Sequence, residues 1–258
     1  MEVFKEKVPK AVEILGDILL NSVYNKNQLE YERQTILQEL EEVNKDNMEV
    51  LMENVYFNCF REHSMGMPIL GDRANIESVT QEMVKAFHAT NYIGNNMVVV
   101  ATGDIKHEEI VDMVETHFGK AEREAPSGLI RPNEEKPAFT PAMMMIRDDE
   151  MINSNVGIFY DAPHWMHQDY YAFLIIERIF GAFSVERNAE HLNDVSKQYN
   201  SLHAMLAEMV DVTKHQAIYS PYADAAIFGN YFFGNEVFTK QMNYAGLLLP
   251  TLYSDYVT

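Results

Sequence analysis

Apolar residues recur at helical spacing through the first part of the chain. Pro9 stands in the first turn of one such segment, which predicts a helix that ends near Ser22. A second helix is expected over about 28–61, with a bend near 44–47 where polar residues interrupt the apolar stripe. These two segments open a layout in which helices and strands are expected to alternate.

Further along, the pattern alternates between helix and strand. The sequence Ser-Val-Thr-Gln at 78–81 resembles a capping box, so a helix is expected from there to about Tyr92. The short apolar run from Met97 to Thr102 predicts a buried strand. A turn at Gly103 then leads into a helix over about 107–118.

The pattern changes after residue 119, where four prolines among charged residues indicate a linker between domains. Beyond it we expect strands at 143–146, 156–160 and 231–233, and a helix at 170–180. A chain of 258 residues, 47% of them hydrophobic, is long enough for more than one domain.

Composition excludes several classes of protein. No run of about 18 apolar residues occurs, so no membrane span is expected. The single Cys59 excludes an internal disulfide and is interpreted as a buried thiol. The formal net charge of −19 disfavours nucleic acid and anionic lipid as partners and favours cationic ligands, although such a charge also serves solubility alone.

Two acidic residues in the second helix are candidates for chemistry. Glu32 and Glu39 are seven residues apart, nearly two turns, so they fall on one helix face. The apolar residues of that face predict that it packs inward: Leu29, Ile36, Leu40 and Val43. A carboxylate buried there needs a cation or a metal as a partner. The alternative is an acid-rich helix whose glutamates lie at the edge of its buried stripe.

Several blocks in order give the chain a resemblance to a known family. They are Val8–Leu15, Glu32–Val43, Ile69–Gly71, Met97–Ala101 and His117–Gly119. Over about 3–118 the chain resembles the first domain of the pitrilysin/insulinase metallopeptidases. The second half resembles the noncatalytic repeat of the same family at 156–158, 174–181 and 222–229, whereas 183–216 departs from it.

The resemblance implies an α+β fold of two related repeats, each a mixed β-sheet covered by helices. It places the later part of the first domain at 1–125, the linker at 126–141 and the early part of the second domain at 142–258. In this family two histidines of an H-x-x-E-H motif and a downstream glutamate hold zinc. By position, Glu39 matches that zinc ligand, and Glu32 matches a second acid that supports catalysis.

The H-x-x-E-H motif is absent, since none of the nine histidines begins it. His164 and His167 lie in an expected loop and have no third ligand, so they are interpreted as surface or capping residues. We expect the chain to start after the motif and to stop within the second domain. One carboxylate cannot make a zinc site, so the chain alone is expected to hold no zinc tightly and to be inactive.

The resemblance implies one of two functions. The first is a subunit of a zinc endopeptidase that removes basic mitochondrial presequences, paired with a noncatalytic alpha-type subunit. The second is a structural core subunit of respiratory complex III, with other subunits of that complex as partners. Both imply the mitochondrial matrix or the matrix side of the inner membrane.

Overall fold

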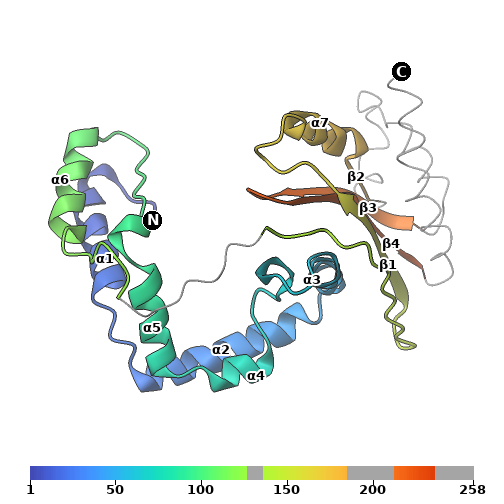
Figure 1. Cartoon of the computed structure of the whole chain (residues 1–258), viewed down its shortest axis with the longest axis horizontal. Coiled ribbons are helices and arrows are strands. Elements are labelled where there is room, and N and C mark those ends of the chain that lie inside the picture. Colours follow the sequence, from blue (N-terminus) through green and yellow to red (C-terminus); the bar gives the residue numbers. More distant parts are fainter. Residues whose placement is uncertain (127–135, 185–211, 236–258) are drawn as a thin grey trace. The chain divides into compact units, whose positions relative to one another are not determined.

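The computed structural model describes residues 1–126, 136–184 and 212–235 (Figure 1). The chain divides into two compact units. Unit 1 comprises residues 1–39 and 71–134, and unit 2 comprises 40–70 and 135–258. Most of the predicted linker and of the divergent region at 183–216 lies outside the described residues, and the domain limits at 125 and 142 stay a prediction.

The described part of unit 1 is built from helices. These are α1 (Val8–Leu20), the first part of α2 (Lys26–Val43), α4 (Arg73–Ser78), α5 (Gln81–Asn91) and α6 (His107–Phe118), with short 3-10 turns at Lys5–Lys7 and Gly94–Asn96. Pro9 lies in the first turn of α1, as predicted. Helix α1 packs against α6 at Gly16, where an added Cβ would lie 3.1 Å from the Cβ of His117.

The predicted capping box at 78–81 is wrong by two residues. Ser78 is the last residue of α4, and its hydroxyl donates to the carbonyl of Asn75. The cap of α5 is Thr80, whose Oγ1 accepts from the backbone N–H of Met83 at 3.2 Å. Both side chains can cap a helix, and the short α4 before them decides which one does.

The predicted strand at Met97–Thr102 is not formed either. The segment has no strand pairing, and the side chains of Val98 and Val100 are 87% and 77% exposed. A strand exists through hydrogen bonds to a neighbouring strand. The described residues of unit 1 contain none, so this apolar run has no sheet to join.

Unit 2 contains a four-stranded sheet in the order β1-β4-β3-β2. Its strands are β1 (Asn153–Asp161), β4 (Ala226–Asn235), β3 (Val212–Pro221) and β2 (Ala182–Ser184). All three pairings are antiparallel, so the expectation of a mixed sheet is wrong for the described strands, while the α+β class is confirmed. The predicted strands at 156–160 and 231–233 lie within β1 and β4.

Helices cover both faces of this sheet (Figure 1). Helix α7 (Tyr170–Phe180), formed where the sequence predicts it, packs on one face with a core that includes Phe228 and Phe232. Helix α3 (Asn47–Cys59) lies on the other face, where Phe60 and Ile227 are buried. Successive strand residues point to opposite faces, so β4 contributes to both cores.

The predicted long helix at 28–61 is two helices, α2 and α3, separated where the polar residues predicted a bend. Asp46 caps α3, because its Oδ1 accepts from the backbone N–H groups of Met48 and Glu49 at 2.8 and 3.2 Å. Such a cap stabilises a helix by about 1 kcal/mol. Cys59 is buried at the end of α3, as expected.

One further predicted strand is missing from unit 2. The segment at 143–146 forms no strand, and the side chain of Met143 is 95% exposed. Among the described helices, none has the length and apolarity needed to cross a bilayer.

Candidate functional site

Glu32 and Glu39 both lie on α2, and both side chains are exposed. The buried residue of this helix is Leu37, whereas the predicted inward stripe from Leu29 to Val43 is half-buried. At about 100° per residue, Glu32 lies about 140° and Glu39 about 160° around the helix from Leu37. The expectation that they share a buried face is therefore wrong, and their carboxylates need no buried partner.

The two carboxylates are also too far apart to act as one pair. Seven residues of α-helix separate their Cα atoms by about 10.5 Å along the axis. Zinc–oxygen bonds are about 2.0–2.2 Å long, so a metal bound by Glu39 would leave Glu32 with a separate, supporting role.

The described residues do not fit a complete zinc site. No group of three or more histidine, cysteine, aspartate or glutamate side chains is arranged to hold a metal in the described ranges. Glu39 contributes one carboxylate, and a catalytic zinc needs three protein ligands. The remaining ligands and the general base of an H-x-x-E-H motif do not occur in the 258 residues.

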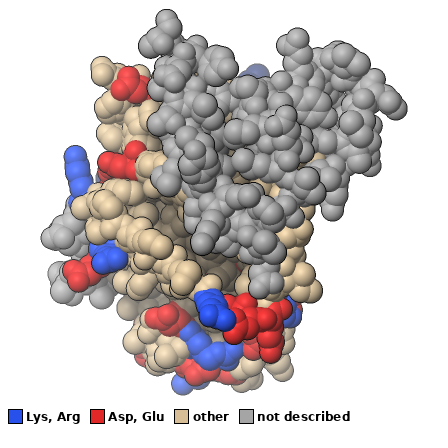
Figure 2. Space-filling model, turned by 90° about the vertical axis from the view of Figure 1, so that its right-hand side faces the viewer, with Lys and Arg blue, Asp and Glu red and all other residues tan. Residues whose placement is uncertain are grey.

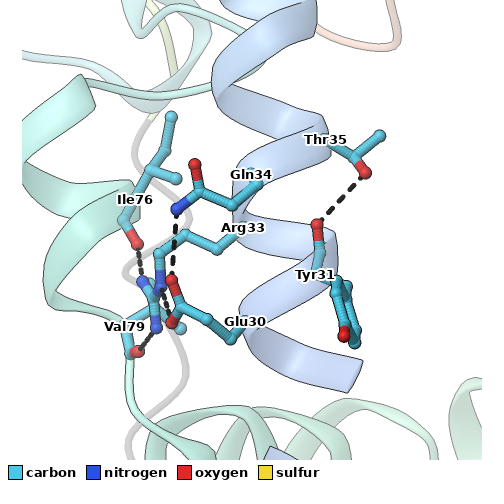
Figure 3. Close-up of polar contacts among 7 residues, drawn as sticks. All are labelled: Glu30, Tyr31, Arg33, Gln34, Thr35, Ile76 and Val79. Carbon is cyan, nitrogen blue, oxygen red and sulfur yellow. Dashed lines mark hydrogen bonds and ion pairs between the residues drawn. The ribbon is translucent and has the colours of Figure 1, made fainter. Parts of the chain in front are cut away.

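Between the two glutamates, Arg33 holds α2 in place (Figure 3). Its guanidinium donates to the backbone carbonyl of Ile76 in α4, to that of Val79 at 2.7 Å, and to the carboxylate of Glu30 at 3.0 Å. The Arg33 side chain is 14% exposed. Hydrogen bonds from a charged donor contribute about 1.5–3 kcal/mol each, so this clamp fixes the rotation of the helix that carries Glu32 and Glu39.

Glu30 also stabilises the position of the Arg33 guanidinium. Hydrogen bonds from Gln34 and Arg33 lower the pKa of the Glu30 carboxyl, which keeps it ionised beside the guanidinium. Sequence reasoning gave Arg33 no role of its own. The i, i+3 spacing of Glu30 and Arg33 was the available signal, but the contacts with Ile76 and Val79 join residues more than forty positions apart.

Among the described residues visible in Figure 2, the acidic side chains do not form one continuous patch. There, Asp and Glu side chains lie among Lys, Arg and uncharged side chains. Charges of mixed sign within a Debye length of about 10 Å partly cancel, so this face by itself does not explain attraction of a cationic ligand.

Two other chemical candidates have structural roles. Burial raises the pKa of the Cys59 thiol, which keeps it protonated and unreactive. His164 and His167 lie in the loop between β1 and α7, as the sequence predicts.

Family models match both parts of the chain. The model described as "Peptidase M16 inactive domain" matches residues 78–247, more than half of the chain, and "Insulinase (Peptidase family M16)" matches residues 1–73. The chain belongs to peptidase family M16.

Relatives with curated descriptions are processing peptidase subunits. The chain is 33% identical over 230 residues to the probable mitochondrial-processing peptidase subunit beta of Schizosaccharomyces pombe, covering 88% of this chain and 49% of that protein. It is 29% identical over 232 residues to the beta subunit of Saccharomyces cerevisiae, covering 88% and 48%. The chain thus spans about half the length of the curated relatives it matches.

Solved structures agree on the fold. A chain in the structure titled "Complex III2 from Candida albicans, Inz-5 bound" matches with a TM-score of 0.77 and 18% identity, over 92% of this chain and 55% of that one. A protease from Helicobacter pylori matches with a TM-score of 0.75 and 16% identity, over 95% and 58%. At these identities the matches show a shared fold.

Proposed function

We propose that this chain is part of a beta-type subunit of a zinc endopeptidase that cleaves mitochondrial presequences. The observation that carries the proposal is the 33% identity to the Schizosaccharomyces pombe beta subunit along 88% of the chain. The partners are then a noncatalytic alpha-type subunit and basic presequence peptides, and the location is the mitochondrial matrix or the matrix side of the inner membrane. The domains at 1–125 and 142–258 would then be parts of two related repeats.

Within this function Glu39 is a zinc ligand and Glu32 an acid that supports the site. Exposure on α2 leaves both carboxylates accessible to groups from another segment. Because no H-x-x-E-H occurs in the 258 residues, another polypeptide segment must supply the two histidines and the general base. The clamp at Arg33 presents Glu32 and Glu39 at a fixed rotation of α2.

The test is reconstitution. The chain is co-expressed with an alpha subunit and with the H-x-x-E-H segment of a related beta subunit, and cleavage of an arginine-rich presequence is measured. Glu39→Gln should abolish cleavage and zinc retention, while Glu32→Gln should reduce turnover with more zinc retained. Glu42→Gln, which removes an exposed charge from the same helix, is the matched control. Full cleavage by the Glu39 variant would contradict the proposed role of this residue.

A second function is supported by the structural match to complex III. A core subunit of that complex keeps the scaffold without needing the metal. Co-purification with complex III subunits, combined with no presequence cleavage in the reconstituted complex, would favour this alternative.

A further inference from the structure

The unpaired apolar run of unit 1 alternates in the manner of a β-strand. Met97, Val99 and Ala101 line a cavity of about 550 Å³ beside α6, whereas Val98 and Val100 do not line it. The side chains of Val98 and Val100 are 87% and 77% exposed, against 45% for Val99. Successive side chains of a strand point to opposite faces. One face of the run therefore lies toward α6, and the other is open to solvent.

The backbone of this run has no partner either. Among the described residues, the N–H and C=O groups from Val98 to Thr102 form no hydrogen bond. The N–H of Met97, just before them, donates to the carbonyl of Gly94 and closes the preceding 3-10 turn. Unpaired backbone groups along an extended segment are a template on which another strand can form.

The sequence around the run carries none of the usual protection of a strand edge. Residues 86–103 contain no Asp, Glu, Lys, Arg or Pro. Charged residues and proline are the common means by which proteins prevent edges from pairing. The formal net charge of −19 makes copies of the chain repel one another, but at this run no like charges would meet. A second copy of the chain is therefore electrostatically compatible with this edge.

We infer that two copies of this chain associate through the run as an antiparallel pair of strands about a twofold axis. Residues directly opposite each other in such a pair lie on the same face, so the axis passes at a residue and not between two residues. Val99 is the middle residue of the five that alternate, and we place the axis there.

This register makes the run complementary to itself. On the open face, Val98 of each copy lies opposite Val100 of the other, and cross-strand pairs of β-branched residues stabilise a sheet. On the cavity face, Met97 of each copy lies opposite Ala101 of the other. The flexible methionine side chain can then enter the space that the short alanine leaves beside α6.

Sedimentation equilibrium of the purified chain at increasing concentration tests the inference. We expect a reversible change from the mass of one chain to that of two. No larger species should form, because a twofold contact uses the same edge of both copies and closes. A chain that stays monomeric up to its solubility limit would overturn the inference and leave this edge to a strand of another polypeptide. Growth beyond two copies would also overturn it.

A charge placed on the open face locates the contact. Val100→Lys sets an ammonium group opposite Val98 of the other copy and should weaken dimerisation by at least about tenfold. Val23→Lys is the matched control, because Val23 belongs to the same unit and is 74% exposed, and it should leave dimerisation unchanged. Circular dichroism checks that both variants fold. Unchanged dimerisation of the Val100 variant, or an equal loss in the Val23 variant, would overturn the inference.

Cysteine cross-linking tests the register. With the axis at Val99, Val99→Cys brings two Cα atoms to about 4.5–5.5 Å, within reach of a disulfide. Val98→Cys leaves its two copies about 6.6 Å apart along the strands in addition to the strand separation of about 4.8 Å, which is too far. Cys59 is buried, so the unaltered chain should give no cross-link. Cross-linking of the Val98 variant equal to that of the Val99 variant would overturn the register. None of these measurements depends on zinc or on the proposed function.

Discussion

The two units bury their apolar residues in different ways. In unit 2, helices α3 and α7 cover opposite faces of one sheet, and the described residues form two contiguous cores. In the described part of unit 1, buried residues such as Val12, Ile76 and Ile93 are scattered between helices, while Val98 and Val100 remain in solvent. A sheet with a helix on each face buries the apolar side chains of its strands on both sides, whereas the apolar run at 97–102 has no strand beside it among the described residues.

This difference matters for function, because Glu32 and Glu39 belong to unit 1, whose described residues form no continuous core. We therefore expect metal binding to require groups in addition to Glu39.

The largest expected change in stability follows from removal of a core side chain from unit 2. Phe232 is fully buried in β4, so Phe232→Ala should destabilise unit 2 by about 3–5 kcal/mol. Hydrogen exchange of the β3 and β4 amides measures this loss within unit 2 alone. Phe87→Ala, at an exposed position of α5, is the matched control and should change exchange little. Comparable effects from the two substitutions would remove the contrast between the units.

The next effect concerns the clamp in unit 1. Arg33→Ala leaves the carbonyls of Ile76 and Val79 without their charged donor, and should destabilise the contact of α2 with α4 by about 2 kcal/mol. Faster hydrogen exchange confined to α2, α4 and α5 would show it. Lys10→Ala, which removes an exposed ion pair with Glu13 on α1, should leave exchange unchanged. Unchanged exchange in the Arg33 variant would show that the clamp does not order α2.

A pH effect should be confined to unit 2. Burial, assisted by the charge of Asp46, raises the pKa of Tyr231 to about 12 from 10.0. The unfolded chain then loses this proton from about pH 10 while the folded chain keeps it, so stability is complete below pH 10 and falls as pH rises toward 12. The contribution is at most about 1.4 kcal/mol per pH unit.

Tyr231→Phe tests this slope. The variant also removes the hydrogen bond to Asn155 and should be less stable at neutral pH, yet its alkaline loss of stability should be shallower. Denaturant midpoints from pH 9 to 12 measure both quantities. A slope equal to that of the unaltered chain would show that Tyr231 ionises at its ordinary pKa in the fold.

The smallest effect is expected at the exposed segment of unit 1. Val98→Thr should change stability by less than about 0.5 kcal/mol, because the side chain meets solvent. If the segment were a buried strand, the added hydroxyl would be considerably more costly. Thermal unfolding of the variant beside the unaltered chain distinguishes the two cases.

Helices whose apolar face and end are both marked in the local sequence could be predicted. Helices α6 and α7 have a continuous apolar face and a glycine directly after the last residue, and both occur where expected. The run at 97–102 failed because an apolar segment becomes a strand only beside another strand. Local sequence carries no information about that neighbour.

The helix that carries Glu32 and Glu39 could be predicted from the sequence, but the surroundings of the two side chains could not. The seven-residue spacing placed Glu32 and Glu39 on one face, but the face with Leu37 is the buried one. Arg33 was missed because its partners Ile76 and Val79 are distant in sequence.

The most direct test of the central claim is the zinc content of the purified chain after dialysis against a mild chelator. The account predicts well under one zinc per chain, with no difference between the unaltered protein and Glu39→Gln, because one exposed carboxylate does not retain the ion. One zinc retained per chain and lost in the Glu39 variant would contradict it, since the 258 residues would then contain a complete metal site.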